Sequence, residues 1–425
     1  MHRSTTRLAG VLATVLLGGG LAAQSDLRDE VVLKNGKTLR GRVIERFGDD
    51  EVLVLQGSRR VRVKHKQVES ITTVNDHMRE FFAHRQKARG NVDREWLLVE
   101  WATSRDLTAL ANLQAMHVAL LDPGHEKAHR HLGHRPIGAD WLWRRGDRLM
   151  PFDAYEHKTS EFGSPKLIEG EHFRLRTNAS LRRAVDTLFD LERFYVFWFE
   201  EFGEALGARE VTEWMDFHLH RDRDDFPPLT STAIPYYFPQ PNGDVAYTYF
   251  AANSGRAELL FQTAQDQILY NALLHGVAPF AAESRDRIAG WIEVGLGQWV
   301  EGRFAGDPGY AEPGPARLNP SYGHVAEGKL PYKLPNLLGV RYGLFHDPSS
   351  QRPAHWAMAT TFVAFLMDDA ERRDKLLSYM KQAYRESRGN SSSLFDRAMG
   401  TKIEALERPW REWVAGATGA AATDR

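Results

Sequence analysis

The chain contains no cysteine in its 425 residues, which excludes disulfide bonds, a thiolate nucleophile and cysteine-ligated metal sites. It also lacks an excess of charge of either sign, since 55 lysines and arginines are balanced by 56 aspartates and glutamates. A nearly neutral chain has no global attraction for nucleic acids or anionic membranes. We therefore expect no nucleic-acid partner.

Long apolar runs are scarce as well. Leu8–Leu21 is the longest of them, and it is short and interrupted by glycines, unlike a comfortable transmembrane helix. A basic start before this run and small residues after it are typical of a secretory signal, which we place at residues 1–24. The expected product is a periplasmic or secreted protein without a membrane span in its mature form. An uncleaved membrane tether is the alternative.

Residues 27–74 contain short alternating apolar runs separated by turn residues such as Asn35-Gly36. This pattern predicts a set of short strands, and it resembles the small Sm-like β-barrels of exported bacterial proteins. A basic edge is formed by Arg59, Arg60, Arg62, Lys64 and Lys66. No aromatic pairs interleave with these charges as in RNA-binding sheets, so we interpret them as a solvated strand edge that blocks aggregation.

Residues 76–150 change to helical periodicity. Apolar residues recur there at steps of three and four: Leu97, Leu98, Trp101, Leu107, Leu110, Leu113, Met116 and Leu120. The segment resembles one or two helical-repeat hairpins followed by a connector. His125, His129 and His131 could suggest a metal site, but in a surface helix we interpret them as ordinary polar residues.

The remainder of the chain begins with alternating strand and helix patterns. Strands are predicted near residues 171–177, 214–220 and 244–250, with a long aromatic-rich helix over 180–202. His218 and His220 share one face of their strand and could bind a metal, although such isolated pairs are more often structural. Helices are predicted again from residue 355 onwards.

The segment 269–301 carries the most distinctive pattern. It reads His275-Gly276-Val277-Ala278-Pro279 and then Trp291-Ile292-Glu293-Val294-Gly295-Leu296. This arrangement resembles the gluzincin (peptidase-MA-like) zinc metallopeptidases, in which His-Glu-x-x-His on one helix and a glutamate on the next helix form the site. The resemblance covers about residues 168–416. It implies that His275 occupies the first ligand position.

The other positions of this motif lack the side chains that bind zinc or activate water in these peptidases. By the resemblance, Gly276 replaces the general base, Pro279 the second histidine and Val294 the glutamate ligand. A catalytic zinc needs about three protein ligands, and one histidine does not supply them. Pro279 also lacks the N–H that a helix interior requires. Glu293 is adjacent to the ligand position, but one residue along a helix is a rotation of about 100°.

These observations lead to three hypotheses. The first is an exported pseudopeptidase without metal or other cofactor, a binding or structural protein of the cell envelope. Its vestigial cleft, with His275, Trp291, Glu293 and Glu301, either holds a peptide or protein ligand or serves only the architecture. The second is an active metal-dependent hydrolase, with zinc at a rearranged site built from His275, Glu293 and His218 or His220. The third is a scaffold protein in which the barrel and the helical hairpins bind the partner.

The expected fold class is α+β. We predict a signal peptide at 1–24, a small β-barrel at 27–74, a helical hairpin with connector at 76–150, a gluzincin-like, mainly helical domain with a small sheet at 165–416, and a disordered tail at 417–425.

Overall fold

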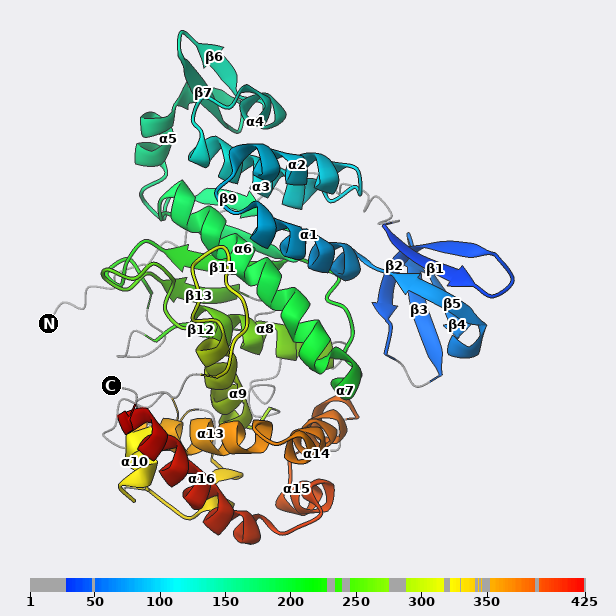
Figure 1. The fold of residues 1–425 in the computed structure, drawn as a ribbon, viewed down its shortest axis with the longest axis vertical. Helices are drawn as coiled ribbons and strands as arrows, with labels where there is room; N and C mark the ends of the chain where they lie inside the picture. Colours follow the sequence, from blue (N-terminus) through cyan, green and yellow to red (C-terminus); the bar gives the residue numbers. More distant parts are fainter. Residues whose placement is uncertain are drawn as a thin grey trace, which may run out of the picture.

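The computed structural model describes residues 28–47, 50–227, 234–238, 245–274, 288–316, 322–328, 330–340, 343, 345, 352–386 and 390–423. The described chain is a mixture of helices and three sheets, which confirms the α+β class (Figure 1). The N-terminal sheet lies to one side of a central body. A three-stranded sheet lies at one end of that body, and the C-terminal helices lie at the other.

The N-terminal segment forms an antiparallel sheet. Its elements are β1 (Asp29–Leu33), β2 (Thr38–Glu45), β3 (Glu51–Gln56), β4 (Arg59–Lys64), the 3-10 turn η1 (His65–Gln67) and β5 (Val68–Thr72). Alternate residues of each strand point to one face, so that Val31, Val43 and Val54 form a small apolar core separate from the main one.

The expected closed barrel at 27–74 is wrong for these strands. Their order is β4-β3-β2-β1-β5, and no pairing joins β4 to β5 among the described residues, so the sheet is open. Closure would require the two end strands to pair. Strand β4 instead exposes Arg59, Arg60 and Lys64 along an outer edge, and charges of this kind discourage pairing with a further strand.

A helical layer follows the sheet. It consists of α1 (Val74–Ala88), α2 (Val92–Thr103), α3 (Thr108–Leu121) and α4 (Glu126–His131). Helix α1 starts with a capping box, in which the Thr73 side chain and the Asp76 side chain each accept a hydrogen bond from the other residue's backbone N–H. At the start of α2, the Asn91 side chain accepts a hydrogen bond from the Arg94 N–H. The Phe81 ring of α1 stacks on the Phe189 ring of a later helix, with centroids 6.4 Å apart.

The segment expected only as a connector folds into an antiparallel sheet. It contains β6 (Arg135–Ile137), β7 (Asp140–Arg145) and β8 (Arg148–Pro151), followed by α5 (Phe152–Lys158). The two tight turns use Gly138 and Gly146 at φ values of 60° and 57°, which a glycine adopts without a steric cost. This small sheet lies at the end of the molecule next to α3 and α4 (Figure 1). Its residues form one wall of a pocket.

A second five-stranded sheet forms the centre of the molecule. Its strands are β9 (Lys166–Glu169), β10 (Phe173–Thr177), β11 (Met215–His220), β12 (Tyr236–Phe238) and β13 (Val245–Tyr249), in the order β12-β13-β11-β10-β9. The three inner strands are parallel and the two outer strands are antiparallel to them. Helix α6 (Leu181–Trp198), extended by the π-turn η2 (Phe199–Gly203) and α7 (Glu204–Leu206), packs on one face, which buries Phe173 and Phe217.

Helices make up the C-terminal part. They are α8 (Leu260–Leu274), α9 (Gly290–Arg303), α10 (Tyr322–Ala326), α11 (Leu334–Leu337), α13 (Arg352–Met367), α14 (Ala370–Met380), the π-turn η4 (Lys381–Arg385), α15 (Ser392–Met399) and α16 (Ile403–Thr423). Helix α16 continues through most of the segment 417–425 that was expected to be a tail. The alanines of this segment favour the helix, since alanine has the highest helix propensity.

One continuous apolar core joins these parts, from Met78 in α1 to Val414 in α16. The helical layer and the C-terminal part therefore bury their side chains together, although the sequence pattern separates them. Within the described ranges, no helix has the length and apolarity that crossing a membrane requires. The expected signal at 1–24 lies outside the described residues.

Candidate functional site

Helix α9 carries Trp291, Glu293 and Val294 of the predicted motif, and it approaches α8 and α13 closely through glycine. A Cβ atom added to Gly297 would lie 2.5 Å from Cγ of Gln262 on α8. One added to Gly295 would lie 2.4 Å from Cγ2 of Val363 on α13. Helix α9 therefore fits between α8 and α13 only because these two positions lack side chains.

Glu301, one of the four expected cleft residues, caps a helix. Its Oε2 atom accepts hydrogen bonds from the backbone N–H groups of Phe261 at 2.8 Å and Gln262 at 3.0 Å, in the first turn of α8. Part of the residue reaches solvent, but the carboxyl group is enclosed against α8, and this burial raises its pKa to about 7 despite the opposing backbone hydrogen bonds. Its role in the structure is to accept hydrogen bonds from N–H groups in the first turn of α8, which have no partner within the helix.

Trp291 and Glu293 lie in the interior at the start of α9. The Trp291 ring is fully buried and packs on Phe362, with ring centroids 5.7 Å apart. Glu293 is 3% exposed. Burial raises the pKa of Tyr384 well above its usual value, and the charge of Glu293 raises it further. Val294, at the expected ligand position, is also buried. The structure thus places these residues in the core and not along an open cleft.

His218 and His220 lie together on the face of the central sheet opposite α6. The His220 ring stacks on Phe162 at 4.0 Å, and His218 lies 5.0 Å from the ring of Tyr247. Burial lowers the pKa of each histidine to about 4, so both are neutral at pH 7. Neither ring nitrogen of His220 has a hydrogen-bond partner among the described residues.

The ring contacts of His218 and His220 are with Phe162, Phe226 and Tyr247, and Glu301 instead binds the backbone of α8. His275, Gly276 and Pro279 lie outside the described residues, so their predicted roles stay predictions. Within the described ranges, no group of three or more histidines and carboxylates is arranged to hold a metal ion.

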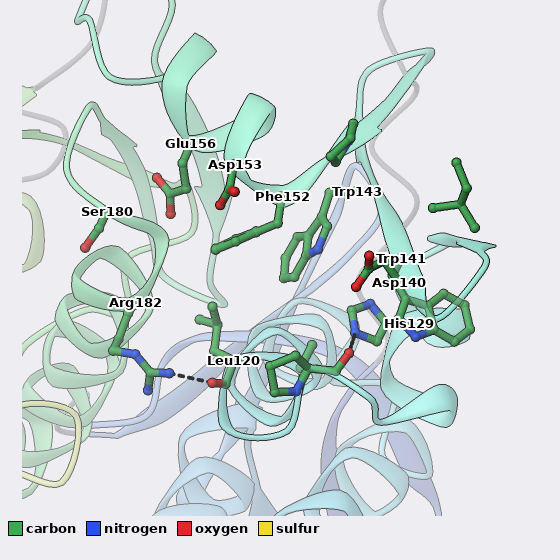
Figure 2. Close-up of a pocket in the computed structure, with 14 residues that line it drawn as sticks. Leu120, His129, Asp140, Trp141, Trp143, Phe152, Asp153, Glu156, Ser180 and Arg182 are labelled. Carbon is green, nitrogen blue, oxygen red and sulfur yellow. Dashed lines mark hydrogen bonds between the residues drawn. The ribbon is translucent and has the colours of Figure 1, made fainter.

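A large cavity lies elsewhere, between the three-stranded sheet, the end of α3, α5 and the first turn of α6. Its volume is about 960 Å³. Figure 2 shows His129, Trp141 and Asp140 at one end and Ser180 and Arg182 at the other. The complete lining is Ala119, Leu120, Pro123, His129, Ile137, Asp140, Trp141, Trp143, Pro151, Phe152, Asp153, Glu156, Ser180 and Arg182.

Aromatic rings form much of the pocket wall. Trp143 lies 4.7 Å from Phe152 between ring centroids (Figure 2), and the Trp141 ring stacks on His129 with an interplanar angle of 2°. The His129 Nε2 atom lies 3.0 Å from the carbonyl oxygen of Pro123, and its Nδ1 lies 2.8 Å from Nδ1 of His134. The pocket therefore has a rigid apolar floor held by a buried histidine pair.

The tautomers of this pair follow from the partners. A carbonyl oxygen only accepts, so Nε2–H of His129 donates to Pro123, and Nδ1 of the neutral ring accepts from Nδ1–H of His134. Burial lowers the pKa of His129, and it lowers that of His134 to about 4. His129 therefore brings no positive charge to the pocket at neutral pH.

Carboxylates line the same pocket. Glu156 is already engaged, since Oε1 accepts from the Leu181 N–H at 2.7 Å and Oε2 lies 2.8 Å from Nζ of Lys166. The Asp140 and Asp153 side chains are exposed and form no hydrogen bond or ion pair with any described residue. Arg182 donates a hydrogen bond to the carbonyl oxygen of Leu120 (Figure 2). The pocket thus combines apolar rings with two carboxylates that lack cationic partners.

Sequence reasoning missed this site, although two signals for it exist. Trp141 and Trp143 lie two residues apart, as on one face of a strand, and Phe152 follows after a turn. The three histidines treated as ordinary polar residues have separate roles: His125 caps α4, His129 is buried, and His131 contacts Asn112 at 3.0 Å. The interpretation of these histidines as ordinary polar residues failed because the small sheet that covers α4 was not predicted.

Comparison with known proteins adds no relative: no protein-family model matches this chain, and no curated protein matches it significantly.

Proposed function

We propose that this protein is an exported pseudopeptidase, that is, a binding protein built on a metallopeptidase-like framework without zinc chemistry. Its ligand is a peptide or protein segment, held in the aromatic pocket between the three-stranded sheet and α6. The gluzincin-like framework and the export of the chain are parts of the proposal that rest on the sequence pattern alone.

The observation that carries the proposal is the use of α9 as a packing element. Val294 and Trp291 are buried, Gly295 and Gly297 allow close contact with two helices, and Glu301 caps α8. A catalytic zinc helix must instead present ligands toward an open position for water and substrate. The pocket supports the binding function, because apolar walls with a few polar groups are typical of ligand sites.

The test of this proposal is a metal and activity analysis of the purified mature protein. Elemental analysis should find zinc only at background level, and a chelator should leave the melting temperature unchanged, because a bound stabilising metal raises that temperature by mass action. Peptide substrates should not be cleaved. One zinc per chain that is lost on His275→Ala would overturn the proposal.

A second function, a metal-dependent hydrolase with a rearranged site, is favoured by one observation. His220 is 2% exposed, and neither of its ring nitrogens has a hydrogen-bond partner among the described residues, as expected of a histidine whose ring binds a metal ion. One zinc per chain that is lost both in His275→Ala and in His220→Ala would support this alternative. His218→Ala and Glu293→Gln would then test the remaining ligands.

A further inference from the structure

We propose that the pocket between the three-stranded sheet and α6 binds a peptide segment that carries lysine or arginine side chains. This inference rests on the proposed binding function and names the ligand of its site. The pocket volume of about 960 Å³ fits a short segment of a few residues, since ligand sites commonly measure about 300–1,000 Å³.

The charges of the lining favour a cationic ligand. The Asp140 and Asp153 carboxylates are exposed and have no ion pair or hydrogen bond with any described residue. Arg182 is the single cation among the lining residues, and it lies at the end opposite Asp140 (Figure 2). Its hydrogen bond to the Leu120 carbonyl holds it against α3. A positive ligand group would therefore find two available carboxylates.

An anionic ligand is disfavoured at the one place that would attract it. The N-terminus of α6 opens on the pocket at Ser180 and would bind a negative group through its free N–H groups. The Glu156 carboxylate already accepts from the Leu181 N–H there, and Lys166 neutralises that carboxylate. A second negative group would meet the Glu156 carboxylate, and the one cation of the lining at this end, Arg182, already donates a hydrogen bond to the Leu120 carbonyl.

The apolar wall suits the remainder of a lysine or arginine side chain. Leu120, Phe152 and Trp143 present methyl groups and rings along which the methylene stem of such a side chain packs. A cation over an indole ring gains further from the electrostatic cation–π interaction. Aspartates at the edges of the same surface would hold the charged end, so shape and charge select the same side chains.

The experiment compares three acetylated, amidated pentapeptides with the full-length mature protein by isothermal titration calorimetry: Leu-Lys-Leu-Lys-Leu, Leu-Gln-Leu-Gln-Leu and Leu-Glu-Leu-Glu-Leu. The lysine peptide should bind more tightly than the glutamine peptide by about tenfold, since two exposed ion pairs together contribute about that factor. The glutamate peptide should bind most weakly. Added salt should weaken the lysine peptide most, because exposed charges are screened.

Variants locate the effect. Asp140→Asn with Asp153→Asn should remove the preference for lysine over glutamine while the melting temperature stays unchanged, because both carboxylates are exposed. Asp147→Asn is the matched control, since Asp147 is exposed in the turn between β7 and β8 and does not line the pocket. It should leave all three affinities unchanged.

The outcomes separate this inference from the function on which it rests. Equal binding of lysine and glutamine peptides, or a preference that survives the double substitution, would overturn the cationic ligand and leave a peptide-binding protein. Binding of none of the peptides would also overturn it. If the protein bound spermidine, tested in the same titration, and none of the peptides, the pocket would be reassigned to free polyamines. Cleavage of any peptide would instead contradict the non-catalytic function.

Discussion

The enclosed carboxylate of Glu301 caps helix α8, and its burial makes the stability of the protein depend on pH. Burial raises its pKa from 4.5 to about 7, so folding favours the protonated form. The unfolded chain loses this proton first as the pH rises. The stabilisation from this group is therefore full below about pH 4.5 and is lost as the pH rises through 7.

The prediction concerns Glu301→Gln, which keeps an oxygen to accept from the α8 backbone but does not titrate. Its melting temperature relative to wild type should rise between pH 4.5 and pH 7. Glu301→Ala, which removes the cap, should cost about 1 kcal/mol of unfolding free energy. A difference between glutamine variant and wild type that does not change with pH would show that the carboxyl is not enclosed.

The buried pair of His129 and His134 has the opposite pH dependence. Burial lowers the pKa of His134 from 6.5 to about 4, so the folded protein holds the neutral ring. The unfolded chain takes up a proton first on acidification. Stability from this group is present above pH 6.5 and should be lost as the pH falls through 4.

The matching variant is His134→Asn, whose amide N–H replaces the donor to Nδ1 of His129 without titrating. Thermal melts should show similar stability of the two proteins above pH 7 and a smaller acid loss in the variant. A wild-type protein that loses no more stability than His134→Asn between pH 6.5 and 4 would contradict a buried neutral pair.

At the scale of elements, α9 depends on glycine for its contacts. Glycine to alanine in a helix normally stabilises by about 1 kcal/mol. Gly295→Ala should instead destabilise by about 1–3 kcal/mol in chemical denaturation, because the new methyl would meet Val363 and the Ala359 carbonyl within 2.5 Å.

The control for this prediction is Gly416→Ala in α16, where a Cβ would have no atom within 4 Å. This variant should be neutral or more stable by up to about 1 kcal/mol. If Gly295→Ala behaved like the control, α9 would not be in close contact with α13, and the packing role proposed for it would fail.

At the scale of the whole molecule, a buried polar network ties the helical layer to the later part of the chain. The Arg85 guanidinium lies between two rings, 3.7 Å from the Phe189 centroid and 4.0 Å from that of Tyr310. The Tyr310 hydroxyl donates to Glu95 and lies 3.1 Å from Nε2 of His117. These residues come from α1, α2, α3, α6 and the segment after α9.

Tyr310→Phe should therefore destabilise by about 1–3 kcal/mol, because Glu95 and His117 lose a buried partner. Calorimetry should still show one transition for the shared core, shifted to lower temperature. Tyr247→Phe is the control, since the Tyr247 hydroxyl has no hydrogen bond with a described residue, and it should stay within about 0.5 kcal/mol. Two separated transitions in Tyr310→Phe would mean that the two parts fold independently.

The sequence by itself determined the mixed fold class and the main helices and strands, because local periodicity sets which face of an element is apolar. The charged edge of β4 and the aromatic face of α6 follow from such patterns. The predicted signal and the first ligand position lie in residues 1–27 and 275–287, outside the described ranges. Export and the motif therefore stay predictions.

Tertiary structure alone decided three features. Whether the N-terminal strands close depends on pairing between β4 and β5, which follow each other in the chain but lie at opposite edges of the sheet. The helix-capping role of Glu301 depends on where α9 meets α8. The aromatic pocket joins residues from α3, a small sheet, α5 and α6. Such contacts between separate elements arise from packing of the whole chain, whereas periodicity reports only the orientation of residues within one element.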